Sequence, residues 1–304
     1  MILKIGDETK NRIKGYIDLL RPFTLLAPII VSSCVMIASL VYTGRNDLLL
    51  TNVITMIVCA SSSFALLNGA SNALNQSTDI KEDSLSKPYR PIPEGKVTPK
   101  EAQVLSATLY ICAFLLSSVV NMIFLLFILL IAVFTITYSI PPRMKQFLFF
   151  NQLWVALPRG LLGILASWSV FGDPFQKVPI AISFIAALFL FGGTTTKDIL
   201  DTDADRKTGI KTLINVVGIK KTAVISFLCM STSFLLIIPL VLFNILETYI
   251  LPLSMLVVLA FYIFRLMIHQ RKNERYENTS AWTVMYATYF IFALSFAFLT
   301  ISFS

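Results

Sequence analysis

The chain has 304 residues, of which 56% are apolar and only 14% are charged, and its mean hydropathy is +0.76. This composition excludes a water-soluble globular fold, a disordered chain and a secreted disulfide-rich scaffold. The formal net charge is +8, but the positive residues are distributed as a membrane topology requires, so no nucleic-acid partner is expected. Roughly nine helical spans of about 20 residues account for the apolar residues.

The first 20 residues differ from the rest of the chain because they are amphipathic. Ile13, Tyr16, Ile17 and Leu20 recur at helical spacing among charged residues. This pattern is typical of a helix that lies in the membrane interface. We therefore expect residues 1–20 to form an interfacial helix ahead of a single transmembrane domain that covers residues 21–304.

The remaining residues form a succession of long apolar runs. In lipid, backbone polar groups are satisfied only in helices or closed barrels, and continuous apolar runs favour helices. The expected fold class is an all-α integral membrane protein with about nine transmembrane helices in a bundle. The expected spans are 22–43, 48–71, 101–120, 122–138, 151–171, 178–196, 222–243, 248–268 and 282–303.

Lys and Arg residues are distributed unequally between the two sides of these spans. Of the 25 such residues, Arg45 and Lys177 fall on one side, Arg159 lies inside a span, and the other 22 fall on the opposite side. Positive residues concentrate in cytoplasmic loops. The bias predicts a cytoplasmic N-terminus and an external C-terminus.

Acidic residues gather in two segments on the expected cytoplasmic side, and the first segment covers residues 72–95. At helical periodicity Asn72, Asn75, Asp79 and Asp83 project on one narrow face. The face therefore presents a row of oxygen ligands.

The second acidic segment covers residues 197–213. Asp198, Asp201 and Asp205 share a helical face, whereas Asp203 is expected to point elsewhere. A pair of solvated acidic loops is the alternative interpretation of the two segments.

Carboxylates four residues apart on one face repel one another unless a cation lies between them. Mg²⁺ takes oxygen ligands and is commonly held by one or two carboxylates together with substrate phosphates. Lys87 and Arg90 follow the first segment, and Lys197 and Lys211 belong to the second. A metal ion and basic side chains together suit the binding of a diphosphate and its departure as a leaving group.

Arg159 is the one charged residue placed well inside an expected span, about eight residues from its start and so roughly 12 Å deep. An unpaired charge at that depth is costly. We expect Arg159 to face a cavity and meet a carboxylate or a substrate oxygen; a structural arginine paired within the bundle is the alternative.

These motifs resemble the UbiA superfamily of intramembrane prenyltransferases. The resemblance rests on Asn75-x-x-x-Asp79-x-x-x-Asp83 followed by KPYRPIP, and on KDILDTDADRKTGIKTL at 197–213. Weaker matches are Arg21-Pro22 and the segment from Tyr138 to Lys145. The family's fold implies a nine-helix bundle around a central cavity, in which both acidic segments bind Mg²⁺ and a prenyl diphosphate.

The motif residues and Arg159 are each given an expected role. The expected metal ligands are Asn75, Asp79 and Asp83 for one Mg²⁺ and Asp198, Asp201 and Asp205 for a second ion or for orienting the acceptor. The expected substrate-binding residues are Asn72, Lys87, Arg90, Tyr138, Lys145, Lys197 and Lys211. The expected catalytic residues are Asp79, Asp83, Asp198, Asp201 and Arg159.

Two positions depart from the family pattern. Gln76 stands where the family usually has Asp, and helical projection places it on the ligand face, so weaker metal binding is expected. Ile214 stands where many members have Pro, and we expect it to alter only the stiffness of the loop.

The implied activity is Mg²⁺-dependent transfer of a polyprenyl group from its diphosphate to a lipid acceptor in the membrane. The ether-lipid type, which transfers geranylgeranyl to geranylgeranylglyceryl phosphate, is favoured over an aromatic quinone precursor or a chlorophyll-type acceptor. A transporter is the rival class, but transport sites usually lie near the bilayer midplane. The expected location is a cell membrane or an inner organelle membrane with the active site facing the cytoplasm, and the oligomeric state stays open.

Overall fold

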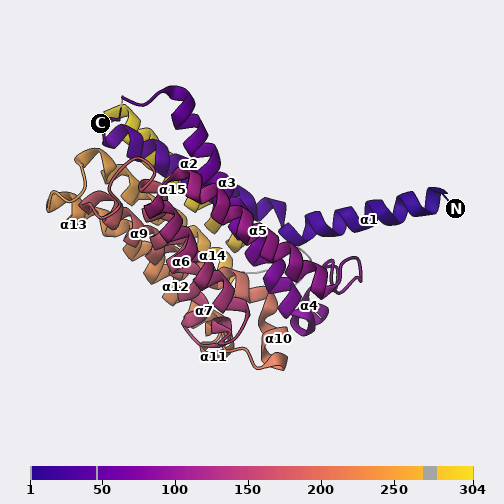
Figure 1. The fold of residues 1–304 in the computed structure, drawn as a ribbon. Coiled ribbons are helices and arrows are strands. Elements are labelled where there is room, and N and C mark those ends of the chain that lie inside the picture. Colours follow the sequence, from indigo (N-terminus) through magenta and orange to yellow (C-terminus); the bar gives the residue numbers. More distant parts are fainter. Residues whose placement is uncertain (1, 46, 270–278, 304) are drawn as a thin grey trace.

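The computed structural model describes residues 2–45, 47–269 and 279–303. Every regular element within these ranges is helical, which confirms the all-α expectation (Figure 1). The elements are α1 (Ile2–Leu20), α2 (Pro22–Tyr42), α3 (Leu50–Thr78), α4 (Ile80–Ser86), α5 (Pro99–Val120), α6 (Met122–Ser139), η1 (Met144–Gln146), α7 (Phe150–Ala156), η2 (Leu157–Leu162), α8 (Gly163–Trp168), α9 (Lys177–Gly193), η3 (Thr194–Lys197), α10 (Asp198–Thr208), α11 (Leu213–Val217), α12 (Ile219–Leu235), α13 (Ile237–Leu242), η4 (Thr248–Leu256), α14 (Val257–Ile268) and α15 (Ser280–Phe303).

Eight helical stretches in the described part of the chain are long and apolar enough to cross a membrane. They are α2, α3, α5, α6, the run from α9 through α10, α12 with α13, η4 with α14, and α15. Their bounds agree with eight of the nine expected spans within a few residues, except where α3 and the α9–α10 run extend into the acidic segments.

The ninth expected span, 151–171, is built from three consecutive pieces, α7, η2 and α8. The middle piece is a π-helical turn that contains Pro158, whose ring nitrogen has no N–H to donate to the helix. Gly160 lies in the same turn, and a Cβ there would meet the Cα of Ala187 at 2.5 Å. The missing side chain therefore lets η2 pack directly against α9.

The first acidic segment does not form the single straight helix that the projection assumed. Helix α3 ends at Thr78, and Asp79 has a non-helical backbone (φ −102°, ψ 27°) before α4 begins. The N–H of Asp79 still donates to Asn75 O at 3.0 Å, and the N–H of Asp83 to Asp79 O at 2.8 Å. The segment is thus a bent helix, with the bend at a candidate metal ligand.

Helix α1 extends away from the bundle, as Figure 1 shows. Only its C-terminal end joins the packed interior, where Leu19 is fully buried in a small cluster with Ile92, Val97 and Ala102. Arg21 separates α1 from α2. At one end of the bundle lie α4, α10 and α11, and at the other lie α13 and the C-terminus (Figure 1).

Candidate active site

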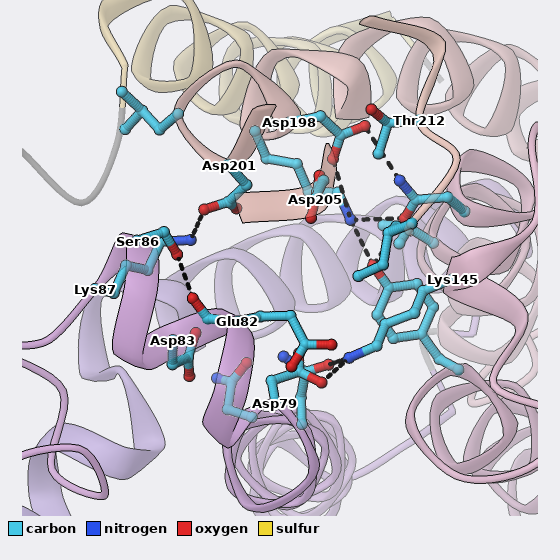
Figure 2. A pocket seen from close by; sticks show the side chains of 18 of the residues that line it. Asp79, Glu82, Asp83, Ser86, Lys87, Lys145, Asp198, Asp201, Asp205 and Thr212 are labelled. Atoms are coloured by element: carbon cyan, nitrogen blue, oxygen red, sulfur yellow. Dashed lines mark hydrogen bonds and ion pairs between the residues drawn. The ribbon is translucent and has the colours of Figure 1, made fainter. Parts of the chain in front are cut away.

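Both acidic segments line one polar cavity at the end of the bundle that holds α4 and α10 (Figure 2). The cavity brings together nearly all of the residues that the sequence singled out. They are Asn72, Asn75, Asp79, Asp83, Lys87, Arg90, Tyr138, Lys145, Arg159, Lys197, Asp198, Asp201 and Asp205. Lys211 is the exception, because it is exposed and does not line this cavity. The expectation that Asp203 points elsewhere is confirmed, since its side chain is exposed.

Asp79 is the centre of charge in the first segment. Its Oδ1 forms ion pairs with Lys145 Nζ and, at 2.7 Å, with Arg143 Nη2. Lys145 Nζ also donates to Asn75 Oδ1 at 3.0 Å. Burial acts to raise the pKa of the Asp79 carboxyl, but the two cations outweigh it and hold this pKa below its ordinary value. The Asp79 carboxyl is therefore ionised, and Lys145 and Arg143 compensate its negative charge.

Asp83 is also buried, with its side chain paired to Arg90. Arg90 Nη1 donates to both carboxylate oxygens of Asp83, at 2.8 and 2.9 Å. Burial raises the pKa of Asp83 in spite of this pair. Burial likewise lowers the pKa of Lys145 in spite of its contact with Asp79. The buried carboxylates Asp79 and Asp83 and their cationic partners therefore compensate for one another's loss of hydration.

The second segment begins at the N-terminus of α10, and neutral side chains from α7 hold its first carboxylate. Asn151 Nδ2 donates to Asp198 Oδ2 at 3.1 Å, and Gln152 Nε2 donates to the same oxygen at 3.3 Å. Asp201 instead receives Lys87 Nζ, which comes from the end of the first segment. This ion pair joins the two acidic segments across the cavity, as Figure 2 shows.

Tyr138 and Lys197 extend the polar network toward the inside of the bundle. Lys197 Nζ donates to Tyr138 Oη at 2.6 Å, and Tyr138 Oη donates to Asn151 Oδ1 at 2.8 Å. Lys197 Nζ also lies 3.2 Å from Asn151 Oδ1. Asn151 therefore connects this hydroxyl and ammonium to Asp198.

Arg159 lies where the polar cavity meets a second, mainly apolar cavity within the bundle, and it lines both. Its guanidinium donates to Tyr286 Oη at 2.8 Å and to Asn68 Oδ1 at 3.0 Å. The expectation that it faces a cavity is confirmed. Among the described residues, the side chains that accept hydrogen bonds from Arg159 are neutral rather than carboxylates, so the expected meeting with a carboxylate is not found there.

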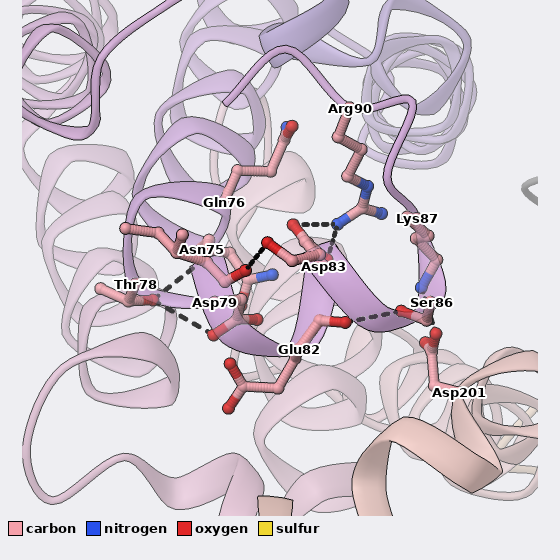
Figure 3. A network of polar contacts seen from close by, with 12 residues as sticks. Asn75, Gln76, Thr78, Asp79, Glu82, Asp83, Ser86, Lys87, Arg90 and Asp201 are labelled. Carbon is pink, nitrogen blue, oxygen red and sulfur yellow. Dashed lines mark hydrogen bonds and ion pairs between the residues drawn. The ribbon is translucent and has the colours of Figure 1, made fainter. Parts of the chain in front are cut away.

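The expectation that Gln76 lies on the ligand face is wrong. Gln76 does not line the polar cavity, and its side chain is 2% exposed. Its Nε2 donates to the main-chain oxygen of Leu19 at 2.8 Å. Figure 3 shows Gln76 pointing away from Asp79 and Glu82. Projection on a straight helix failed here because the segment bends and because Gln76 finds its partner on α1.

Several cavity residues were missed in the sequence. Glu82 lines the cavity one helical turn after Asp79, and Arg143 Nη2 reaches Glu82 Oε1 at 3.1 Å. The charge of Glu82 and its position between two predicted ligands were the available signal. Asn151 had no comparable signal, because a single Asn in an apolar run acquires its role only through tertiary contacts.

The donor set of the cavity fits Mg²⁺ when a substrate supplies further oxygens. In the described part of the chain, no three His, Cys, Asp or Glu side chains converge as a ready-made metal site. Carboxylate and amide oxygens are hard ligands, and Mg²⁺ is usually bound by one or two carboxylates together with substrate phosphates rather than by a protein cage. Asp79 with Asn75 on one side and Asp198 with Asp201 on the other meet that requirement.

The chain matches known proteins along most of its length. It is 29% identical over 218 residues to digeranylgeranylglyceryl phosphate synthase from Methanothrix thermoacetophila, covering 70% of this chain and 78% of that protein. The enzyme of the same name from Methanosphaera stadtmanae is 27% identical over 215 residues, covering 69% and 72%.

Solved structures show the same fold. A UbiA homolog from Archaeoglobus fulgidus bound to DMAPP and Mg²⁺ superimposes with a TM-score of 0.71 at 20% identity, over 95% of this chain and 100% of that one. The same homolog bound to GPP and Mg²⁺ gives a TM-score of 0.70 at 21% identity, over 95% and 99%. The UbiA prenyltransferase family matches residues 26–296. The chain belongs to this family and is an integral membrane prenyltransferase.

Proposed function

We propose that this prenyltransferase transfers a geranylgeranyl group from geranylgeranyl diphosphate to geranylgeranylglyceryl phosphate, with Mg²⁺ as its cofactor. The observation that carries the proposal is the adjacency of two cavities. A polar cavity lined by acidic and basic side chains and an apolar cavity among the helices share Arg159, Trp282 and Tyr286 in their walls. A diphosphate with a long hydrocarbon chain has the same two parts.

Different side chains of the polar cavity bind different parts of the prenyl diphosphate donor. We place the diphosphate between the two acidic segments, where Lys87, Lys145 and Lys197 can donate to its oxygens. Asp79 and Asn75 on one side and Asp198 and Asp201 on the other would hold Mg²⁺, which when bound would neutralise charge on the departing diphosphate. Arg159 lies at the neck, where the first carbons of the isoprenoid pass from the polar into the apolar cavity.

The reaction breaks the bond between C1 of the donor and the bridging diphosphate oxygen, and the diphosphate leaves with the electron pair. The hydroxyl oxygen of the acceptor bonds to the resulting allylic cation at C1, and its proton passes to an oxygen of the released diphosphate. The apolar cavity excludes water, which would otherwise capture the cation. Tyr286 and Trp282 line both cavities and offer π faces to a cation near the neck.

The orientation in the membrane follows from charge. The polar cavity opens at the end of the bundle where the positive loops gather, so we place it on the cytoplasmic side. Helix α1 leaves the bundle at Leu20, and Ile13 and Ile17 are 56% and 51% exposed. We place α1 in the membrane interface with these two side chains against lipid, as an appendage to a single domain over residues 21–304.

Purified protein in lipid nanodiscs tests the proposal directly. With Mg²⁺, geranylgeranyl diphosphate and geranylgeranylglyceryl phosphate, the expected products are diphosphate and digeranylgeranylglyceryl phosphate, identified by mass spectrometry. Parallel reactions offer 4-hydroxybenzoate and homogentisate as acceptors. Prenylation of an aromatic acid in place of the glyceryl phosphate would reassign the acceptor. Release of diphosphate that does not depend on Mg²⁺ would overturn the cofactor assignment.

A further inference from the structure

Three amide side chains on α3 form a row along the side of the helix that meets the junction between α1 and α2. Asn68, Asn72 and Gln76 are spaced four residues apart, so they lie one above another on the helix. All three donate to main-chain oxygens of the junction between α1 and α2, on both sides of Arg21. The bonds are Asn68 Nδ2 to Thr24 O at 3.2 Å, Asn72 Nδ2 to Leu20 O at 2.9 Å and Gln76 Nε2 to Leu19 O at 2.8 Å.

Arg21 has a left-handed backbone, with φ 52° and ψ 68°. A residue other than glycine in this region costs on the order of 1–3 kcal/mol and persists where its surroundings fix it. The amide row provides that constraint, because it holds carbonyl groups before and after Arg21. The side chain of Arg21 lines the polar cavity together with Asp79 and Asp83. The strained junction therefore brings a cation to the wall of the cavity.

We propose that Gln76 is a positioning residue, which fixes the α1–α2 junction and thereby holds Arg21 at the polar cavity, and that it does not bind metal. This inference rests on the proposed prenyl transfer, because Arg21 affects the reaction only as part of the site. Gln76 thus acts at a distance, through main-chain geometry.

The chemistry of the amide explains why glutamine occupies this position. Only the NH₂ group of the Gln76 amide can donate a hydrogen bond to the carbonyl oxygen of Leu19. This requirement fixes the orientation of the Gln76 side chain. An ionised aspartate has no donor and is one methylene shorter, so it would lose the bond to Leu19 and place a charge beside a carbonyl oxygen. Gln76 Oε1 is buried without a hydrogen-bond partner, so replacing Gln76 by Met costs one bond and also removes one unsatisfied atom.

The first experiment separates a positioning role from a metal-binding role. In Gln76→Asp, which restores the family's usual carboxylate, binding of Mn²⁺ alone is measured by electron paramagnetic resonance. We expect no tighter Mn²⁺ binding than in the parent enzyme and, in the transfer assay, a kcat/KM lower by about tenfold because Arg21 is displaced. Tighter Mn²⁺ binding with undiminished turnover would overturn the proposal.

The second experiment tests whether Gln76 acts through Arg21. Gln76→Met and Arg21→Ala are combined in a double-mutant cycle on kcat/KM, and we expect Gln76→Met to cost much less once Arg21 is absent. Ser106→Ala is the matched control, since Ser106 is equally buried, donates to the Ala70 carbonyl of α3 at 2.8 Å and lies outside the cavity. We expect its effect on kcat/KM to be small and additive with that of Arg21→Ala.

Each outcome of the cycle is decisive. An equal loss from Gln76→Met with and without Arg21 would refute the positioning role, as would coupling of the same size for Ser106→Ala. If Gln76→Met does not fold in detergent, Gln76→Glu, of nearly the same volume, takes its place in the cycle. Failure of the parent enzyme to release diphosphate would count against the proposed function instead, and the Mn²⁺ measurement would still decide whether position 76 binds metal.

Discussion

The two acidic segments face one cavity but are stabilised by different means. The carboxylates of the first segment, Asp79 and Asp83, are paired with cations, some brought by distant parts of the chain. In the second segment, Asp198 begins a regular helix and receives neutral amide donors from α7. Asp201 of the second segment also has a cation, Lys87, so the contrast is between Asp79, which depends on charge compensation, and Asp198, which depends mainly on oriented dipoles. Equivalent substitutions at these two residues should therefore have different consequences.

The two acidic segments also differ in the course of their backbones. The first segment bends at Asp79, and Arg143 Nη2 donates there both to Thr78 O at 3.3 Å and to the Asp79 carboxylate. The second segment continues without a bend from η3 into α10. The ion pair of Lys87 with Asp201 is the direct link between them. A substrate that draws Lys87 toward its phosphates would therefore loosen the link between the segments.

The largest contrast is expected between Asp79→Asn and Asp198→Asn. Both should lower kcat about 100-fold or more, because each removes charge stabilisation at the diphosphate. Only Asp79→Asn leaves two cations, Lys145 and Arg143, without their shared counter-ion, and breaking a buried pair costs about 3–5 kcal/mol. Asp198→Asn should lower stability much less, since its partners from α7 are neutral and its ion pair with Lys197 Nζ is long, at 3.9 Å.

Thermal unfolding in detergent, measured beside diphosphate release, checks this contrast. An equal fall in melting temperature for both variants would show that the segments are held alike. Unchanged turnover in either variant would remove that carboxylate from the site.

A smaller effect is expected from Asn151→Ala, which tests the dipolar support of the second segment. Asn151 contacts Asp198, Tyr138 and Lys197, and its loss frees all three without removing a charge. Loss of a residue that orients ligands typically costs 10–100-fold, so we expect a fall in kcat of about that size. Steady-state kinetics at varied Mg²⁺ provides the measurement, and Asn151→Asp, which keeps only the acceptor, should recover little. Activity within about twofold of the parent would contradict a supporting role.

Periodicity in the sequence was sufficient to predict the spans and one wall of the cavity. The apolar runs placed the spans, and the spacing of the acids placed Asp198, Asp201 and Asp205 on one cavity wall, because α10 is a regular helix. Periodicity failed at Gln76, because the helix bends three residues later, at Asp79, and because the Gln76 amide bonds to α1. Lys211 was expected in the site from its place in the motif alone, but its exposed side chain lies outside the cavity.

Other cavity residues escaped prediction for a different reason: they come from segments that are distant along the chain. Arg143 and Asp79 are 64 residues apart in the chain, and Asn151 and Asp198 are 47 apart. No local pattern encodes such pairs, because each depends on how whole helices pack. The acidic residues of the cavity and the basic residues Lys87, Arg90 and Lys145 were therefore recognisable from the sequence, whereas the supporting contacts of Arg143 and Asn151 were not.

The smallest effect is expected from Asp203→Asn, and this variant sharpens the comparison within one helix. Asp203 and Asp205 are two residues apart in α10, but Asp203 is exposed and Asp205 lines the cavity. Exposed substitutions away from special features change stability by about 0.5 kcal/mol or less, so Asp203→Asn should keep the melting temperature and turnover of the parent. Asp205→Asn, with the same change of charge, should raise the Mg²⁺ concentration needed for half-maximal activity. Similar metal dependence in the two variants would mean that net charge, rather than the face of α10, governs metal binding.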